Sequence, residues 1–123
     1  MAKVLVIEDN PANMKLAVLI LEHGGHEVLR ASTAEDGIMI AHESHPDIIL
    51  MDIQLPGMDG LAATRLLKQD QLTSGIKIIA LTAFAMEGDK EKIRAAGCDA
   101  YIGKPVRINE FQVVLGAFSE DKQ

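Results

Sequence analysis

The stretch Ile48-Ile49-Leu50-Met51-Asp52 decides the fold that we expect for this chain. Four consecutive apolar residues, two of them β-branched, predict a short strand that is buried on both faces. The next segment, Ile53-Gln54-Leu55-Pro56-Gly57-Met58-Asp59-Gly60, contains the turn-forming pair Pro56-Gly57, so Asp52 is expected where the strand becomes a loop. Ligands of open parallel α/β sheets bind beyond the carboxyl ends of the strands. Asp52 is therefore a candidate functional residue, although its position alone equally fits an ordinary solvated carboxylate.

The composition indicates a single globular domain. The chain has 123 residues, of which 48% are hydrophobic and 24% are charged, and this is enough for a proper core. Only 3% of the residues are aromatic, so the core is expected to consist mainly of Leu, Ile, Val, Ala and Met. The net charge of −6 argues against nucleic-acid binding, which requires a basic face.

Several features favour a cytoplasmic location. The single cysteine, Cys98, excludes an intrachain disulfide and fits a reducing compartment. The apolar run before Glu8-Asp9 is too short for a signal peptide, and no stretch approaches the roughly 20 residues of a membrane span. We expect one domain at residues 1–119 and a polar tail at residues 120–123, with no output domain.

Short β-branched runs alternate with segments of helical apolar spacing along the chain. Strands are expected at residues 4–7, 27–31, 48–51, 77–81 and 100–103, with Thr82 just after the fourth. A first helix is expected from Pro11, with Asn10 as candidate N-cap, to Gly24-Gly25, and a second from the capping box Ser32-Thr33-Ala34-Glu35 to a point before Pro46. Asp59-Gly60 favours the start of a third helix, which is expected from about Leu61 to Gln69. Two more are expected from Glu87 to Ala96 and from Asn109 to Phe118, the last with an inward face of Phe111, Val114, Leu115 and Phe118. This (βα)5 pattern predicts a three-layer α/β sandwich with a five-stranded parallel sheet.

With the flavodoxin-like strand order 2-1-3-4-5, the first and third strands lie side by side. Residues that are far apart in the sequence then meet at one edge of the sheet, at the carboxyl ends of the strands: Glu8, Asp9, Asp52, Thr82 and Lys104. This convergence is the main evidence from the residues themselves for a functional site.

The expected site has the chemistry of a phosphoryl acceptor. Three crowded carboxylates repel one another, which raises their pKa values and costs stability unless a cation lies among them. An all-oxygen site with few carboxylates suits Mg²⁺, or Mn²⁺, with phosphate as a further ligand. Lys104 offers a positive charge and Thr82 a hydroxyl donor to phosphate oxygens. With these neighbours, Asp52 is expected to act as a carboxylate nucleophile that forms an aspartyl-phosphate.

The motifs of the chain resemble those of bacterial response-regulator receiver domains, which have a CheY-like fold. They cover essentially the whole chain in the family's order: Glu8-Asp9, Asp52, Leu55-Pro56-Gly57-Met58-Asp59-Gly60, Ala80-Leu81-Thr82-Ala83, Ala96-Gly97 and Lys104-Pro105. Residues 6–10 and 82–86 are in addition similar to those of stand-alone receivers that control cell division and polarity.

The resemblance implies a role for each matching residue. Asp52 would be phosphorylated, and Asp9, Asp52 and the backbone carbonyl of Gln54 would bind Mg²⁺. Glu8 would act through a water. The family often has Asp at this position, and the longer side chain of Glu8 leaves open whether it could bind the metal directly. Thr82 and Lys104 would contact the phosphoryl group. Tyr101 matches the family's aromatic switch, and Lys104-Pro105 matches a peptide bond that is usually cis in the family.

The resemblance also implies partners. Sensor histidine kinases would supply and remove the phosphoryl group, and membrane-bound kinases would recruit the protein to the cell pole. A downstream kinase or adaptor would bind the face of the fourth helix, fifth strand and fifth helix. The chain would then be a phosphoacceptor with at most slow self-catalysed turnover, and not an enzyme.

Alternative functions share parts of this pattern. A receiver within a hybrid histidine kinase, or a phosphorelay intermediate that passes phosphate on, would have the same motifs. An aspartyl-phosphate hydrolase of the haloacid-dehalogenase type usually carries a second Asp two residues after its nucleophile, where this chain has Gln54. A flavodoxin-like electron carrier must bind phosphate in its first loop, where Glu8-Asp9 would repel it.

Other residues favour structural interpretations. The four histidines form two His-x-x-His pairs near helix C-termini, where the helix dipole favours imidazolium, and we do not expect them to bind a metal: His23, His26, His42 and His45. Cys98 is expected to be a small buried residue without an activating base. Tyr101 fits either a core position or the switch.

Overall fold

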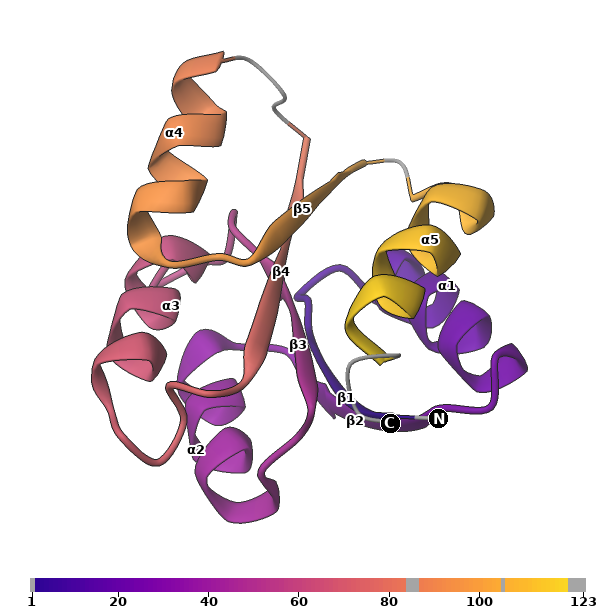
Figure 1. The fold of residues 1–123 in the computed structure, drawn as a ribbon, viewed down its shortest axis with the longest axis horizontal. Helices are drawn as coiled ribbons and strands as arrows, with labels where there is room; N and C mark the ends of the chain where they lie inside the picture. The colour runs from indigo at the N-terminus through magenta and orange to yellow at the C-terminus, as the bar shows by residue number, and fades with distance from the viewer. Residues whose placement is uncertain (1, 84–86, 105, 120–123) are drawn as a thin grey trace.

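A computed structural model describes residues 2–83, 87–104 and 106–119, and it forms a parallel sheet with helices on both faces (Figure 1). The strands are β1 (Lys3–Ile7), β2 (Glu27–Ala31), β3 (Ile48–Asp52), β4 (Lys77–Thr82) and β5 (Ala100–Gly103). The helices are α1 (Pro11–His23), α2 (Ala34–Ser44), α3 (Gly60–Gln69), α4 (Glu87–Ala96) and α5 (Ile108–Ser119). The strand order is β2-β1-β3-β4-β5, which confirms the predicted flavodoxin-like sandwich.

Some sequence predictions concern parts of the chain outside this description. They are the cis bond before Pro105, the motif residues 84–86, the inward position of the Phe118 side chain and the polar tail at residues 120–123. In the part of the chain that is described, no helix combines the length and apolar character needed to cross a membrane.

The predicted elements are confirmed with small shifts at their ends. Helix α3 begins at Gly60, one residue before the predicted start, and α5 extends one residue further at each end. Shifts of this size are normal because helix termini fray. Strand β3 includes Asp52, so the candidate nucleophile is its last residue and does not lie in the following loop.

The predicted capping box of α2 is wrong by one residue. The N-cap is Thr33, whose Oγ1 accepts a hydrogen bond of 3.1 Å from Asp36 N, whereas the sequence pattern assigned the box to Ser32 and Glu35. Both Ser32 with Glu35 and Thr33 with Asp36 have a hydroxyl residue three positions before an acidic residue, so the sequence allows either start of the helix. The backbone decides between them, because Thr33 is extended and the helix begins at Ala34.

Helices α1 and α3 begin with caps that hold them directly behind the strand ends. Asn10 Oδ1 accepts hydrogen bonds from Ala12 N and Asn13 N, at 2.9 and 3.1 Å. Asp59 Oδ1 accepts one from Ala62 N at 2.8 Å, so the interpretation of Asp59 as a helix start is confirmed. Both caps satisfy backbone donors of a first helical turn.

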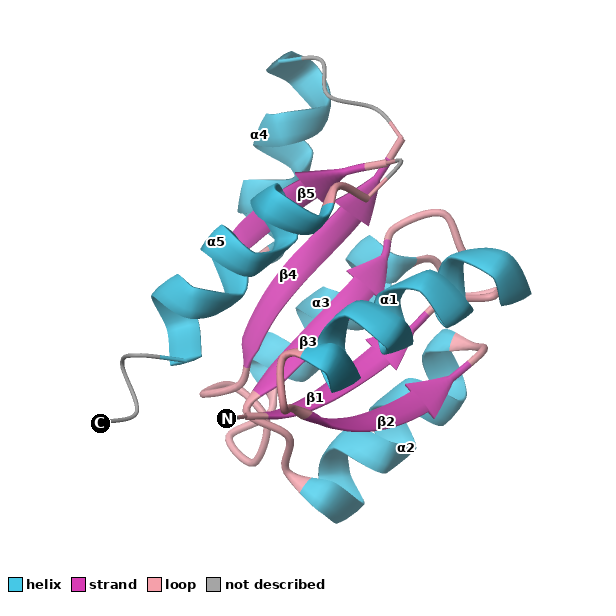
Figure 2. Ribbon diagram, turned by 90° about the vertical axis from the view of Figure 1, so that its right-hand side faces the viewer, coloured by secondary structure: helices cyan, strands magenta, loops and turns pink. Residues whose placement is uncertain are grey.

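Strand β3 lies at the centre of the sheet, and all of its residues are buried, as the apolar run predicted. Helices α1 and α5 cover one face of the sheet, and α2, α3 and α4 cover the other (Figures 1 and 2). The strands are parallel, so their carboxyl ends lie at a common edge (Figure 2). This edge is the place where the sequence predicted the site.

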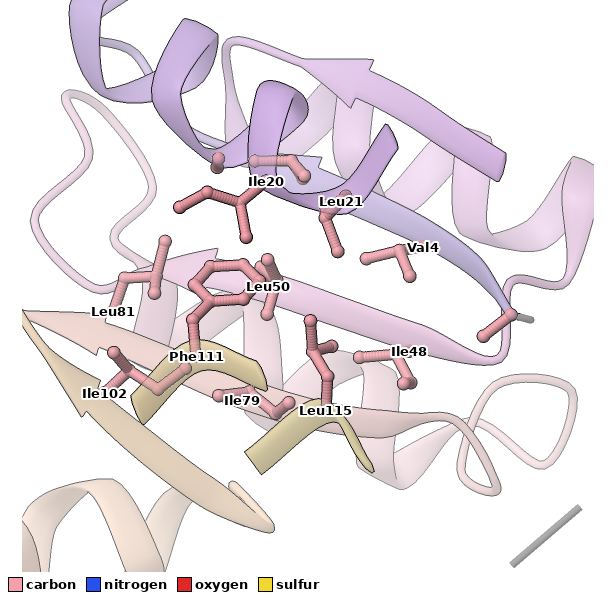
Figure 3. Close-up of a cluster of buried hydrophobic side chains, with 13 residues drawn as sticks. Val4, Ile20, Leu21, Ile48, Leu50, Ile79, Leu81, Ile102, Phe111 and Leu115 are labelled. Atoms are coloured by element: carbon pink, nitrogen blue, oxygen red, sulfur yellow. The ribbon is translucent and has the colours of Figure 1, made fainter. Parts of the chain in front are cut away.

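The two faces of the sheet carry separate hydrophobic clusters. The cluster under α1 and α5 is aliphatic except for Phe111, which is fully buried and projects from α5 beside Leu50 (Figure 3). The cluster under α2 and α3 combines strand residues such as Met51 with small helix residues such as Ala34 and Ala63. The prediction of a mainly aliphatic core is confirmed.

Gly60 allows α3 to start against the end of β3. A Cβ at this position would overlap the carbonyl oxygen of Asp52 and would lie 2.6 Å from the Cα of Ile53. Because these contacts are backbone atoms, they cannot move aside as a flexible side chain can. The loop that follows Asp52 therefore depends on a residue without a side chain.

We predict that Gly60→Ala lowers the free energy of unfolding by about 1–3 kcal/mol, the usual cost of overpacking. Gly116→Ala in α5 is the matched control, because nothing lies within 4 Å of its Cβ position. It should raise the free energy of unfolding by about 0.5–1 kcal/mol by improving helix propensity. Urea denaturation measures both, and equal stability of Gly60→Ala and wild type would contradict the close approach.

Candidate functional site

Two adjacent strands bring three carboxylates together. Glu8 directly follows β1, Asp52 ends β3, and the two strands pair with Ile7 opposite Met51. Glu8, Asp9 and Asp52 each have a carboxylate oxygen within 4.8 Å of the other two. Glu8 and Asp52 are each only 2% exposed, whereas Asp9 is exposed. The predicted convergence of the carboxylates is confirmed.

Lys104, which follows the edge strand β5, brings a positive charge to this cluster. Its backbone N–H donates a 2.8 Å hydrogen bond to the carbonyl of Thr82 at the end of β4. Its Nζ lies 2.9 Å from Glu8 Oε1 and 3.0 Å from Asp52 Oδ2. One ammonium therefore bridges two buried carboxylates.

Backbone N–H groups hold the other oxygen of each buried carboxylate. Asn10 N donates to Glu8 Oε2 at 3.1 Å, and Gln54 N donates to Asp52 Oδ1 at 2.9 Å. Glu8 Oε1 has the Lys104 ammonium at 2.9 Å and no other donor among the described residues. Buried oxygens normally have donors, so Glu8 Oε1 is an acceptor with unused capacity.

The charges of the cluster do not balance, since three carboxylates face the single ammonium of Lys104. Burial raises the pKa of Glu8, and the neighbouring Asp52 raises this pKa further against the opposing effect of Lys104. Burial alone would lower the pKa of Lys104, but the carboxylates of Glu8 and Asp52 outweigh it and raise this pKa. The cluster is therefore short of positive charge.

These donors fit a hard divalent cation. The three carboxylate oxygens lie close enough to share one ion, and among the described residues Glu8 Oε1 has no partner besides the Lys104 ammonium. Mg²⁺ prefers oxygen ligands, uses few protein carboxylates and retains several waters, and the exposed Asp9 gives the cluster an open side.

Residues 4–115 match the model of the response regulator receiver domain. The chain belongs to this receiver family. This match confirms the resemblance that the motifs indicated. Receivers work with histidine kinases in two-component signalling.

Named relatives cover almost all of the chain. It is 45% identical to the polar-differentiation response regulator DivK of Brucella ovis, over 96% of both proteins. It is 34% identical to the receiver domain of a Pseudomonas aeruginosa sensor histidine kinase that was solved with a magnesium ion in its active-site cleft (TM-score 0.88, covering 95% of this chain and 96% of the other). A Vibrio cholerae chemotaxis protein, 23% identical, shares the fold (TM-score 0.90, covering 96% of this chain and 98% of the other).

The other residues assigned to the receiver site occupy different environments. Thr82 ends β4 and is 1% exposed, next to the β5 end that carries Lys104. Gln54 is exposed, and its N–H rather than its side chain contacts Asp52. Tyr101 is 37% exposed, with Lys90 Nζ at 5.6 Å from the centre of its ring. The alternative that Tyr101 is a core residue is therefore wrong.

Two of the histidines have structural partners. His42 places Nε2 at 2.6 Å from Asp70 Oδ2 and Nδ1 at 3.0 Å from the carbonyl of Ile38, and its hydrogen bond to Asp70 raises the pKa of His42. His26 Nδ1 accepts a 3.0 Å hydrogen bond from Ala2 N. These contacts join neighbouring segments of the fold.

Cys98 is half-buried, which is less than the buried position expected from the sequence. It packs against the cluster under α2 and α3, and its Sγ donates to Thr64 Oγ1 at 3.9 Å. Burial raises the pKa of the thiol, which is the opposite of what a nucleophilic cysteine requires.

Sequence reasoning missed two contacts of the site. It assigned Lys104 to a phosphate, whereas the ammonium already pairs with Glu8 and Asp52. A count of charges at the strand ends could have indicated this pairing, because Lys104 is the sole cation among the five converging residues. The hydrogen bond from Asn10 N to Glu8 was also missed, since Asn10 was recognised only as a helix cap.

The charge imbalance predicts opposite effects of two substitutions on stability without divalent cations. Asp52→Asn removes one of the repelling carboxylates and should raise the melting temperature in EDTA, although most substitutions destabilise. Lys104→Gln leaves two buried carboxylates without their counter-charge and should lower the free energy of unfolding by up to about 3 kcal/mol.

Thermal melts at neutral pH in EDTA measure both variants against wild type. A lower melting temperature of Asp52→Asn would show that the carboxylates do not repel one another in the folded state. Glu91→Gln, at an exposed position in the middle of α4, controls for the loss of one negative charge.

Proposed function

We propose that this receiver accepts a phosphoryl group on Asp52 from a histidine kinase and signals by a phosphorylation-dependent protein contact. The observation that carries the proposal is the position of Asp52, which is buried at the end of β3 with Lys104 Nζ at 3.0 Å and two further carboxylates beside it. A nucleophile, a cationic clamp and a cation-binding cluster are the parts that phosphoryl transfer requires.

The two oxygens of Asp52 are held differently. Gln54 N donates to Oδ1, which fixes the orientation of the carboxylate, while Oδ2 faces the Lys104 ammonium. A phosphoryl group on Oδ2 would lie beside this ammonium, which would then compensate its negative charge. The buried hydroxyl of Thr82, at the neighbouring strand end, would donate to another phosphoryl oxygen.

The carboxylates of Glu8, Asp9 and Asp52, with the backbone carbonyl of Gln54, would hold Mg²⁺, with Glu8 acting through a water. An ion held there would supply positive charge to offset the negative charge of the transferring phosphoryl group. The relative solved with magnesium in its active-site cleft supports this assignment.

We further propose that the chain is a phosphoacceptor and not an enzyme with turnover of its own. Gln54 stands at the position where aspartyl-phosphate hydrolases carry a general acid, and an amide cannot transfer the proton. The 45% identity to DivK supports an output in cell division and polarity, through kinases that recruit the protein to the pole. The identity to a receiver domain of a sensor kinase supports, as a second candidate, a receiver that passes phosphate on.

The partner surface is proposed on α4, β5 and α5. Tyr101 lies exposed on β5 under Lys90, close to the strand end that carries Lys104. Phosphate on Asp52 would draw the Thr82 hydroxyl inward, and Tyr101 would turn into the vacated space. This change is a shift between two states, limited by the differential affinity of the phosphoryl group for them.

Asp52→Asn keeps the shape of the side chain but removes the nucleophile, so acetyl phosphate with Mg²⁺ should label wild type and not this variant. The label should be unstable in alkali, as expected of an acyl phosphate, and EDTA should abolish it. Equal labelling of Asp52→Asn would place the acceptor elsewhere in the chain.

Mg²⁺ should stabilise the folded protein by mass action, because the three carboxylates are separated in the unfolded chain. The expected gain is about 2.7 kcal/mol at a hundredfold excess over the dissociation constant. Asp9→Asn should weaken this gain, and thermal melts across a Mg²⁺ titration measure it. A melting temperature of wild type that ignores millimolar Mg²⁺ would contradict the cation site.

Thr82→Ala should accept phosphate on Asp52 but couple it poorly to partner binding, because the hydroxyl that reports the phosphoryl group is lost. The affinity for a cognate kinase is measured with and without phosphorylation, by titration calorimetry. An equal gain of affinity on phosphorylation in wild type and Thr82→Ala would remove Thr82 from the switch.

A further inference from the structure

Lys104 and Arg107 line one cavity beside the acceptor. The cavity has a volume of about 250 Å³, and Gly103 and Glu110 complete its lining. Lys104 connects this cavity to the acceptor, because its ammonium lies 3.0 Å from Asp52 Oδ2. Arg107 is therefore a second cationic residue in the cavity that Lys104 lines, and the receiver motifs assign it no role.

The backbone of Arg107 is held firmly while its side chain stays in solvent. Phe111 N donates a 2.9 Å hydrogen bond to the carbonyl of Arg107, and Phe111 itself is fully buried. Val106, on the other side, packs against the same core cluster. Arg107 is exposed, so its guanidinium extends from a fixed point.

The guanidinium has no carboxylate within ion-pair distance among the described residues. Arg107 lies directly before α5, at the positive end of the helix dipole, where a positive side chain is electrostatically unfavourable. The corresponding positions of α1, α2 and α3 hold Asn10, Thr33 and Asp59, whose side chains accept backbone hydrogen bonds. Arginine has donors alone and cannot do so.

We propose that Arg107 binds the leaving group of acyl phosphate donors and so favours them over donors with an uncharged leaving group. The proposal rests on the proposed function of Asp52 as acceptor. An oxygen of Asp52 attacks the phosphorus, the bond between phosphorus and the acyl oxygen breaks, and its electron pair leaves on the carboxylate of the acyl group. The planar fork of arginine matches this carboxylate with two parallel hydrogen bonds.

A phosphoramidate donor gives the matched comparison. Attack by Asp52 breaks its phosphorus–nitrogen bond, and the protonated nitrogen leaves as neutral ammonia. Arg107 offers this leaving group no charge attraction. Both donors carry the same phosphoryl group, so interactions of Lys104, Thr82 and Mg²⁺ with it affect the two rates alike.

The test measures initial rates of Asp52 phosphorylation with acetyl phosphate and with phosphoramidate, in the full chain with Mg²⁺. Arg107→Gln should slow the reaction with acetyl phosphate about tenfold, in line with loss of a charge-assisted hydrogen bond, and change the phosphoramidate rate less than about twofold. Arg107→Lys should retain part of the preference. Glu110→Gln removes a negative charge from the cavity and should raise the acetyl phosphate rate.

Arg65→Gln is the control, because it removes the same charge from an exposed position on α3 and should leave both rates unchanged. An equal loss with both donors in Arg107→Gln, or no loss with either, would overturn the role of Arg107 while leaving Asp52 as acceptor. Failure of both donors to label wild type would instead overturn the proposed function, and the role of Arg107 with it.

Discussion

The contact between the Lys104 ammonium and the carboxylates of Glu8 and Asp52 is the interaction on which the site depends. Both carboxylates are buried, and burial of a charge is costly unless an opposite charge accompanies it. The three residues follow or end β1, β3 and β5, so the contact joins the centre of the sheet to its edge. The strand order β2-β1-β3-β4-β5 therefore matters for stability, because it brings the Lys104 ammonium to the two buried carboxylates.

One ammonium does not satisfy this cluster completely. Glu8 retains an oxygen without a hydrogen bond, and its pKa is raised by burial and by Asp52. The excess of negative charge favours binding of a cation, and a cation that binds only the folded state would stabilise the fold. Under the proposed function, a phosphoryl group on Asp52 would add negative charge beside Lys104 and so change the charges that its ammonium faces.

Backbone contacts in the loop after β3 hold Asp52 in place. Gln54 N orients the Asp52 carboxylate, Gly60 lets α3 start against the end of β3, and Asp59 caps that helix. The loop between Asp52 and α3 is thus positioned by contacts at both ends. A rigid scaffold that carries reactive groups on its loops is the usual arrangement of functional sites in α/β proteins.

The sequence by itself determined the fold and the composition of the site. The apolar run at Ile48–Met51, the caps Asn10 and Asp59 and the alternation of strands and helices along the chain are local or periodic signals, and the structure confirms them because the packing agrees with them. The tertiary structure alone decided the pairing of Lys104 with two carboxylates, the exposure of Tyr101 and the shared cavity of Lys104 and Arg107. These features depend on distances between side chains from different strands and helices, and such distances leave no periodic trace in the order of the residues.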